Sequence, residues 1–95
     1  MYHYVLLKLK EGCTAAEIRK DYDELFPQLL EQVPELEEVE FLENCIVRDI
    51  NMDVMIRSKF SDPEGLPKYL KHPLHLAFAA RTGGNVVNRV AFDHM

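Results

Sequence analysis

Apolar and polar residues alternate along the first ten positions of the chain. Alternation with a period of two is typical of a β-strand, in which neighbouring side chains point to opposite faces. The segment 2–9 is therefore predicted to be a strand. One of its faces carries His3, Val5, Leu7 and Leu9. We expect this face to be the one that the helices cover.

The spacing of apolar residues then changes to three and four positions, which predicts an amphipathic helix. The residues at this spacing are Ile18, Tyr22, Leu25, Phe26, Leu29 and Val33. Thr14 and Glu17 form a capping-box pattern that marks the start of the helix, and Pro34 marks its end. Pro27 lies inside the pattern without an amide hydrogen to donate, so we expect a kink or a break over residues 23–26.

A hairpin of two strands is predicted over residues 36–60. Apolar residues among glutamates predict a strand from Leu36 to Val47, in which adjacent apolar residues allow a β-bulge. Residues 48–51 form a polar turn. Clear alternation follows from Val54 to Phe60 and predicts the second strand of the hairpin.

Two short helices and a final strand are predicted next. Asp62 can cap a helix and Pro63 has the backbone angle of a first helical position, so the first helix should begin there. The His72-Pro73 step moves residue 72 out of the helical region, so a second helix should run from Pro73 to about Thr82. Gly83-Gly84 ends it, and the final strand covers residues 86–93.

This order of elements, β-α-β-β-α-β, predicts an α+β protein of the ferredoxin-like class. Both β-α-β units cross over on the same side, so the helices should cover one face of a four-stranded antiparallel sheet. The chain contains no internal repeat, linker or low-complexity tract. We therefore expect a single domain over residues 1–95.

The other face of the predicted sheet is left open. It would carry Tyr4, Leu6 and Met55 beside Lys8 and Arg57, a mixture suited to a subunit contact. A domain of this size also buries only about 60–65% of its unfolded surface alone, so a partner would add stability. We therefore expect a homodimer in which two sheets close face to face as a dimeric α/β barrel.

The composition narrows the function classes. A net charge of −5 argues against a nucleic-acid surface, because phosphate binding depends on clustered lysines and arginines. No apolar run approaches the ~20 residues that a membrane span needs, and the start lacks the basic region of a signal peptide. A cytoplasmic location with no membrane contact is the resulting expectation.

The two cysteines lack the spacing of a redox or zinc motif. We expect both to be reduced, with Cys45 in the core and Cys13 in a loop, although the sequence leaves a disulfide between them open.

Several separated segments carry a resemblance to a known family. They are His3 to Lys10, the Val33-Pro34 step, Phe60 ahead of the second helix, Tyr69-Leu70-Lys71-His72-Pro73-Leu74-His75, and Arg89 to Asp93. Through them the chain resembles the stress-responsive dimeric α/β-barrel (Dabb) family over essentially its whole length. The sequence departs from the family at Glu35 and Leu42, where members usually have glycine, which affects the expected geometry around the second strand.

The resemblance implies a homodimer with a central barrel and a ligand pocket between sheet and helices in each subunit. The family includes plant stress-associated proteins, a polyketide cyclase that makes olivetolic acid, and bacterial members without an assigned role. In that cyclase the catalytic residues look like His3, Tyr69 and His75 of this sequence. The chemistry implied is an aldol-type ring closure that needs no cofactor.

The same comparison implies a role for each residue. His75 would be the general base, Tyr69 would polarise a substrate carbonyl, and His3 would orient or bind the substrate. On an unbroken helix Tyr69 and His75 would point to different sides, but the restart at Pro73 could bring both to one cavity. In the first turn of the new helix, His75 would be kept neutral by the helix dipole.

Other interpretations of these residues, including a purely structural role, remain open. Histidines and tyrosines at a seam between sheet and helices are often satisfied polar groups of a core. His72 and His75 could suggest a metal site, but Pro73 separates the rings and no third ligand is evident.

Two functions follow: a cofactor-free enzyme or binding protein for a small, largely apolar carbonyl compound, or a non-catalytic stress-response dimer acting through stability or partner contacts. A cavity of a few hundred cubic ångströms at these residues would favour the first.

Overall fold

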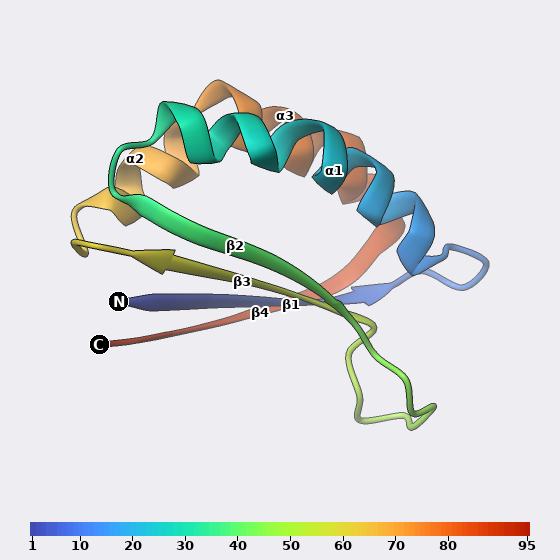
Figure 1. Ribbon diagram of the computed structural model, residues 1–95. Helices are drawn as coiled ribbons and strands as arrows, with labels where there is room; N and C mark the ends of the chain where they lie inside the picture. Colours follow the sequence, from blue (N-terminus) through green and yellow to red (C-terminus); the bar gives the residue numbers. More distant parts are fainter.

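Helices lie on one face of a four-stranded antiparallel sheet in the computed structural model, which describes residues 1–95 (Figure 1). The strands are β1 Tyr2–Leu9, β2 Leu36–Glu43, β3 Val54–Phe60 and β4 Val86–His94. The helices are α1 Ala15–Gln32, α2 Gly65–Lys71 and α3 Pro73–Thr82, with a 3₁₀ turn at Gly83–Asn85. The fold is the ferredoxin-like α+β class that the element order predicts. No helix has the length and apolar character needed to cross a membrane.

The strand order is β2-β3-β1-β4, so β1 lies between β3 and β4. The register places His3 of β1 opposite Ser58 of β3 on one side and opposite Asp93 of β4 on the other. Cross-strand partners share a face, so these three side chains meet under the helices. The register of β2 against β3 shifts between Leu36 and Glu38, whereas it is regular across the adjacent apolar residues Phe41 and Leu42, where a bulge was predicted.

A single apolar cluster fills the space between the sheet and the helices. The buried stripe of α1 is the predicted one, and it forms one cluster with inward side chains of β1, β2 and β3. The buried members are Leu7, Leu9, Ile18, Tyr22, Leu25, Phe26, Leu29, Val33, Leu36, Phe41, Val54, Ile56, Phe60, Tyr69 and Phe78. This cluster holds the helices in fixed positions over β1, where the histidine lies.

Helix α1 corrects one prediction. It runs without a break from Ala15 to Gln32, with Pro27 inside it. Pro27 is exposed, and so is Asp23, whose carbonyl would have accepted the missing amide bond. Water can solvate that carbonyl on the outer side of the helix, so the cost of the proline is small enough for packing to overcome.

The helix starts differ in detail from their patterns. α1 begins after Thr14, as predicted, but the Thr14 side chain makes no capping bond. α2 begins at Gly65, not at Pro63. The Asp62 carboxylate accepts a bond from the Glu64 amide at 2.8 Å, in a turn that precedes the helix.

Helix α3 confirms the prediction of a restart at Pro73 and an end at Thr82. His72 has an extended backbone, with φ −64° and ψ 138°. Its Nδ1 accepts a hydrogen bond from the amide of Leu74 at 3.1 Å, so the imidazole caps the new helix. The step between α2 and α3 is thus fixed by a side chain as well as by the proline.

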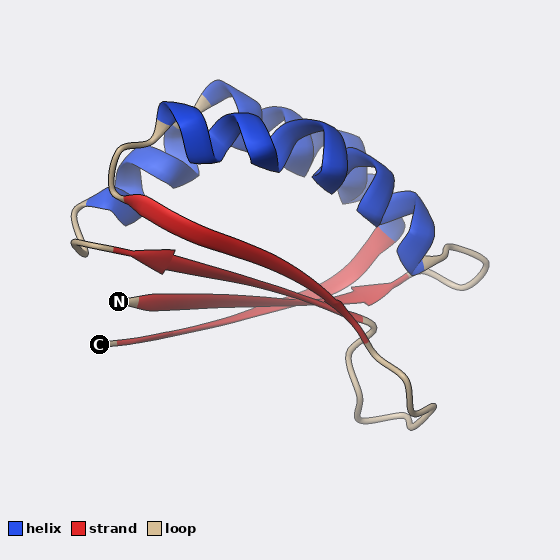
Figure 2. Cartoon of the chain, viewed as in Figure 1, coloured by secondary structure: helices blue, strands red, loops and turns tan.

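The connection between β2 and β3 is longer than predicted, because β2 ends at Glu43 and not at Val47. Figure 2 shows this loop extending away from the sheet. Cys45 is exposed in it, which corrects its predicted place in the core; Cys45 and Cys13 are both free thiols.

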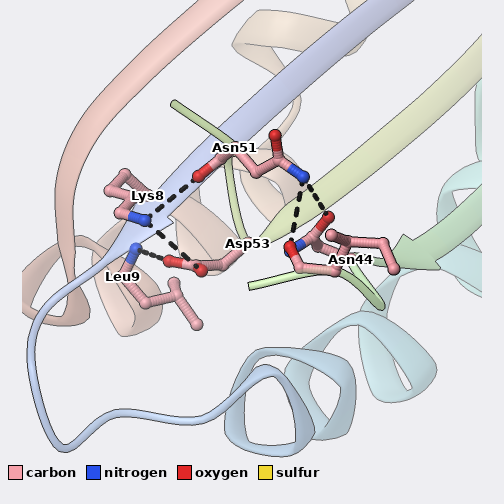
Figure 3. A network of polar contacts seen from close by, with 6 residues as sticks. Lys8, Leu9, Asn44, Asn51 and Asp53 are labelled. Carbon is pink, nitrogen blue, oxygen red and sulfur yellow. Dashed lines mark hydrogen bonds and ion pairs between the residues drawn. The ribbon is translucent and has the colours of Figure 1, made fainter. Parts of the chain in front are cut away.

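Polar contacts fix the base of this loop to β1 (Figure 3). The Asp53 carboxylate accepts the amide of Leu9 at 2.7 Å, and Lys8 Nζ donates to the carbonyl of Asn51 at 3.0 Å. The side-chain amide of Asn51 donates to that of Asn44 at 3.1 Å. The side-chain amides of Asn44 and Asn51 both donate to the carbonyl of Ile46. These bonds replace a continued strand ladder, which explains why the apolar residues at 46 and 47 do not extend β2.

Glu35, one of the two departures from the family pattern, lies against Gly65. A Cβ on Gly65 would lie 2.5 Å from the Cβ of Glu35 and 3.0 Å from Cδ1 of Phe60. The Glu35 carboxylate pairs with Lys68, and its carbonyl accepts the amide of Ser61 at 2.8 Å. The side chain of Glu35 fits in front of β2 because Gly65, the first residue of α2, has no side chain.

The face of the sheet opposite the helices is largely apolar along its middle. Tyr4, Leu6 and Met55 are half-buried on it by their neighbours. The register adds Leu42 opposite Met55, Val90 opposite Leu6 and Phe92 opposite Tyr4, all three of them exposed.

Candidate functional site

A cavity of about 300 Å³ lies between the sheet and the helices. Its floor comes from β1 and β4 and much of its roof from α2 and α3. Ten of its fourteen lining residues are hydrophobic. The other four are His3, His75, Arg89 and Asp93, and Tyr69, one of the ten, adds a phenol hydroxyl. An apolar space with a few convergent polar groups is the usual form of a small-molecule site.

His3 lies on the floor of the cavity and is 5% exposed. Its Nδ1 forms a short contact with the carboxylate of Asp93, its partner across β1 and β4. A carboxylate accepts from Nδ1–H, which orients the ring and leaves Nε2 as its other nitrogen. Nε2 is buried and has no hydrogen-bond partner in the protein. The arrangement is that of an imidazole oriented by a carboxylate, with its second nitrogen unpartnered.

Tyr69 lies at the centre of an aromatic group and is 2% exposed. Its ring centroid is 5.4 Å from that of Phe60, 6.2 Å from Phe26 and 6.1 Å from His3. Ser58 Oγ donates to the phenol oxygen in a long bond of 3.5 Å. Burial raises the pKa of the Tyr69 phenol well above its ordinary value. The phenol therefore keeps its proton at neutral pH and can serve as a donor, not as a base.

His75 lies in the first turn of α3, with its ring centroid 4.6 Å from that of Tyr69. Burial lowers the pKa of His75, the charges of His3 and Arg89 lower it further, and the carbonyl of Leu70 opposes part of the shift. The ring is therefore neutral at pH 7. Its Nδ1 is buried and has no partner. His75 thus offers the cavity a second nitrogen that can accept a proton.

The three residues singled out from the sequence, His3, Tyr69 and His75, all line this one cavity. The restart of the helix at Pro73 is what allows it, since it places Tyr69 and His75 on separate helices with adjoining rings. Two imidazoles, each with a buried unpartnered nitrogen, and one phenol then line the same space. Such a set can move a proton and stabilise a developing oxyanion.

Sequence reasoning missed two polar residues of this site, Asp93 and Arg89. Both were recognised only as part of a closing strand. The alternation of side chains along a strand could have indicated them. Positions 89, 91 and 93 share a face of that strand, and antiparallel pairing with β1 puts this face beside His3.

His72 takes no part in the site, because its Nδ1 caps α3. No group of three or more histidine, cysteine, aspartate or glutamate side chains is placed to hold a metal ion. A second hollow, of about 380 Å³, lies against the other face of the sheet and the β2–β3 loop. Glu43 is its only ionisable lining residue, so the convergent chemistry lies in the sheet–helix cavity alone.

The sequence model of the family described as "Stress responsive A/B Barrel Domain" matches residues 1–95. No curated protein matches the chain.

Solved structures share the fold along nearly the whole chain. A Dabb family protein from Mesorhizobium loti is 22% identical with a TM-score of 0.74, covering 99% of this chain and 93% of its own. A dimeric ferredoxin-like protein of unknown function from Jannaschia sp. CCS1 is 19% identical with a TM-score of 0.82, covering 99% and 96%. The hydroxynitrile lyase from Passiflora edulis is 16% identical with a TM-score of 0.76, covering 98% and 89%. At these identities the likeness shows the fold and not the activity.

Proposed function

Since the chain belongs to the family of stress-responsive A/B barrel domains, we propose that it is a homodimer whose sheet–helix cavities bind a small, largely apolar carbonyl compound. We further propose that it catalyses cofactor-free chemistry of the cyclase or lyase type there. The observation that carries this proposal is the pair of buried, unpartnered nitrogens, His3 Nε2 and His75 Nδ1, which share one cavity with Tyr69. Buried polar atoms without partners are uncommon unless a ligand satisfies them.

In the proposed reaction, neutral His75 removes a proton from the carbon next to a substrate carbonyl. Tyr69 donates its phenol proton as a hydrogen bond to the carbonyl oxygen as negative charge develops on it. His3, oriented by Asp93, binds the substrate and holds the reacting group toward His75. These are the roles implied by the resemblance to the cyclase that makes olivetolic acid, and the neutral His75 and protonated Tyr69 suit them.

The cavity also bears on the alternative of a non-catalytic stress-response protein. Such a protein needs no space at the seam between sheet and helices, and a solidly packed seam would be the more stable arrangement. A volume of about 300 Å³ lined by the three predicted residues supports a ligand-binding function instead. The hydroxynitrile lyase of Passiflora edulis shows that the fold can carry a lyase.

The homodimer is supported by the open face of the sheet and by similar structures that are described as dimeric. Val90 and Phe92 are exposed on this face beside half-buried Leu6 and Tyr4. A second copy would cover them. Light scattering at micromolar concentration should give twice the monomer mass of 11.1 kDa, and a monomeric mass would contradict the dimer.

Turnover of two carbonyl compounds tests the chemistry: a linear poly-β-keto thioester for ring closure and 4-hydroxy-4-phenylbutan-2-one for retro-aldol lyase activity. His75→Ala should lower kcat on the active substrate by about 10²- to 10⁴-fold, the usual contribution of a general base. The matched control is His72→Asn, which removes an imidazole but keeps a helix-capping side chain. An unchanged rate in His75→Ala would rule out the base. Binding without turnover of either substrate would reject the catalytic part, and absence of binding would reject the whole proposal.

A further inference from the structure

Arg89 is the only arginine that lines the sheet–helix cavity. It lies on β4 opposite Leu7, and it is exposed although it lines the cavity, so its guanidinium is at the rim. The cavity is otherwise mostly apolar. A cation at the edge of an apolar space is a feature that the roles of His3, Tyr69 and His75 leave unexplained.

The guanidinium of Arg89 has no partner within the chain. Arg19, Arg57 and Arg81 each pair with one or more carboxylates. Arg89 makes no ion pair and no side-chain hydrogen bond, although acidic residues outnumber basic ones by sixteen to eleven. Its five N–H donors are thus all available to something that the cavity holds.

The two ends of the cavity floor carry opposite charges. Arg89, Ala91 and Asp93 occupy one face of β4, with Ala91 in the middle opposite Val5. Four residues of a strand span ~13 Å, so the cation and the carboxylate are well separated along the floor. Asp93 is occupied by His3, whereas Arg89 is free. An elongated ligand with one anionic end would lie along this axis in one direction only.

We propose that Arg89 is a specificity-determining residue, and that the carbonyl compound bound in this cavity carries a carboxylate which Arg89 holds. This inference rests on the proposed function and names its substrate class. A planar guanidinium matches a carboxylate with two parallel hydrogen bonds. A single cation at the rim suits a singly charged carboxylate better than a phosphate dianion. Asp93 repels the same group, so the apolar body and the reactive carbonyl point toward Tyr69 and His75.

Binding of such a ligand would also change the pKa of His75, the proposed general base. The charge of Arg89 contributes to the lowered pKa of His75. A carboxylate paired with Arg89 cancels that contribution, so the pKa of His75 should rise when an acid binds and stay unchanged when a neutral analogue binds. The ligand itself would thereby make His75 a stronger base.

A matched pair of ligands tests the proposal: 3-phenylpropionate and the neutral 3-phenylpropionamide. Their dissociation constants are measured by calorimetry on the full chain, and cavity residues are followed by NMR. The wild type should bind the acid about tenfold more tightly than the amide, the gain of a charge-assisted pair in an exposed place. Arg89→Gln should lose this preference and keep its affinity for the amide, and Arg89→Lys should restore part of it. The control is Arg48→Gln, which removes the same charge from the β2–β3 loop and should retain the preference.

The outcomes separate the two proposals. Equal binding of acid and amide by the wild type, or a preference that survives in Arg89→Gln, would overturn the role of Arg89 and leave the ligand-binding cavity intact. An equal loss of preference in Arg48→Gln would show a general charge effect and also overturn it. If neither compound perturbs the cavity residues of the folded wild type, the proposed function fails, and the assignment of Arg89 fails with it.

Discussion

Strands β3 and β4 both pair with β1, yet they meet the helices in opposite ways. Every side chain that β3 turns toward the helices is buried: Val54, Ile56, Ser58 and Phe60. On β4, only Val86 at the start of the strand packs against this core, and the later side chains turned the same way are exposed: Arg89, Ala91 and Asp93. One side of the central strand is therefore closed by core packing, and the other is left open as a cavity with charged ends. The contrast shows that the site exists because one edge strand contributes small and charged residues where its counterpart contributes apolar ones.

Truncation of a side chain on the closed side should have the largest effect. Phe60 is 1% exposed and packs against Tyr69, so Phe60→Ala should lower the free energy of unfolding by about 4 kcal/mol. Arg89→Ala on the open side should change it by less than about 0.5 kcal/mol, because Arg89 is exposed and unpaired. Urea unfolding of both variants measures this difference. Comparable losses would mean that β4 is packed as tightly as β3.

An added methyl group on the closed side should also be costly. Gly65→Ala places a Cβ against the Cβ of Glu35 and the ring of Phe60, and we expect a loss of about 2 kcal/mol. The control is Gly84→Ala, where nothing lies within 4 Å of the new atom. If both variants have the same urea midpoint, the packing around Gly65 is looser than these distances indicate.

A larger side chain on the open side should affect binding more than stability. Ala91→Leu extends into the cavity and should weaken binding of 3-phenylpropionamide at least about tenfold, equivalent to ~1.4 kcal/mol, with little change in the urea midpoint. Ala80→Leu makes the same change at an exposed position of α3 outside the cavity. Retained affinity in Ala91→Leu would show that ligands do not occupy the space over β4.

The smallest expected effect is a dependence of stability on pH. The pKa of His75 is lowered in the folded protein, so the unfolded chain binds more protons as the pH falls below about 6.5. The contribution of His75 to the free energy of unfolding is therefore fully present above pH 6.5. It is lost as the pH falls toward the pKa that His75 has in the folded protein. His75→Gln should flatten this part of the curve of unfolding free energy between pH 5 and 7. An identical slope in wild type and variant would contradict the burial of the ring.

The strands and helices could largely be predicted from sequence because their patterns are local. Alternation located β1 and β3, and the His72-Pro73 step located the boundary of α3. The end of β2 was mistaken because Asn44 and Asn51 bond to each other and to the loop backbone, contacts that span several residues of an irregular turn. The unbroken α1 shows packing overriding the local effect of Pro27.

The site could be predicted only in part, for a similar reason. His3, Tyr69 and His75 were found through a family resemblance, and their meeting depends on the bend at Pro73. The pairing of Asp93 with His3 depends on the register of β4 against β1. No local pattern specifies that register, because it is set by strands from opposite ends of the chain.

The contact between His3 and Asp93 joins residues ninety positions apart, and it has a consequence for how the protein is made. During synthesis on a ribosome, β1 is produced first, but its histidine has no orienting carboxylate until β4 has been added. Closing so long a loop is entropically costly and slow, so docking of β4 should be a late step in folding. A newly made chain would thus hold the packing between β1, β3 and the helices before it holds the complete sheet–helix cavity. A molecule whose residues 86–94 have frayed or been trimmed would lose the carboxylate that orients His3.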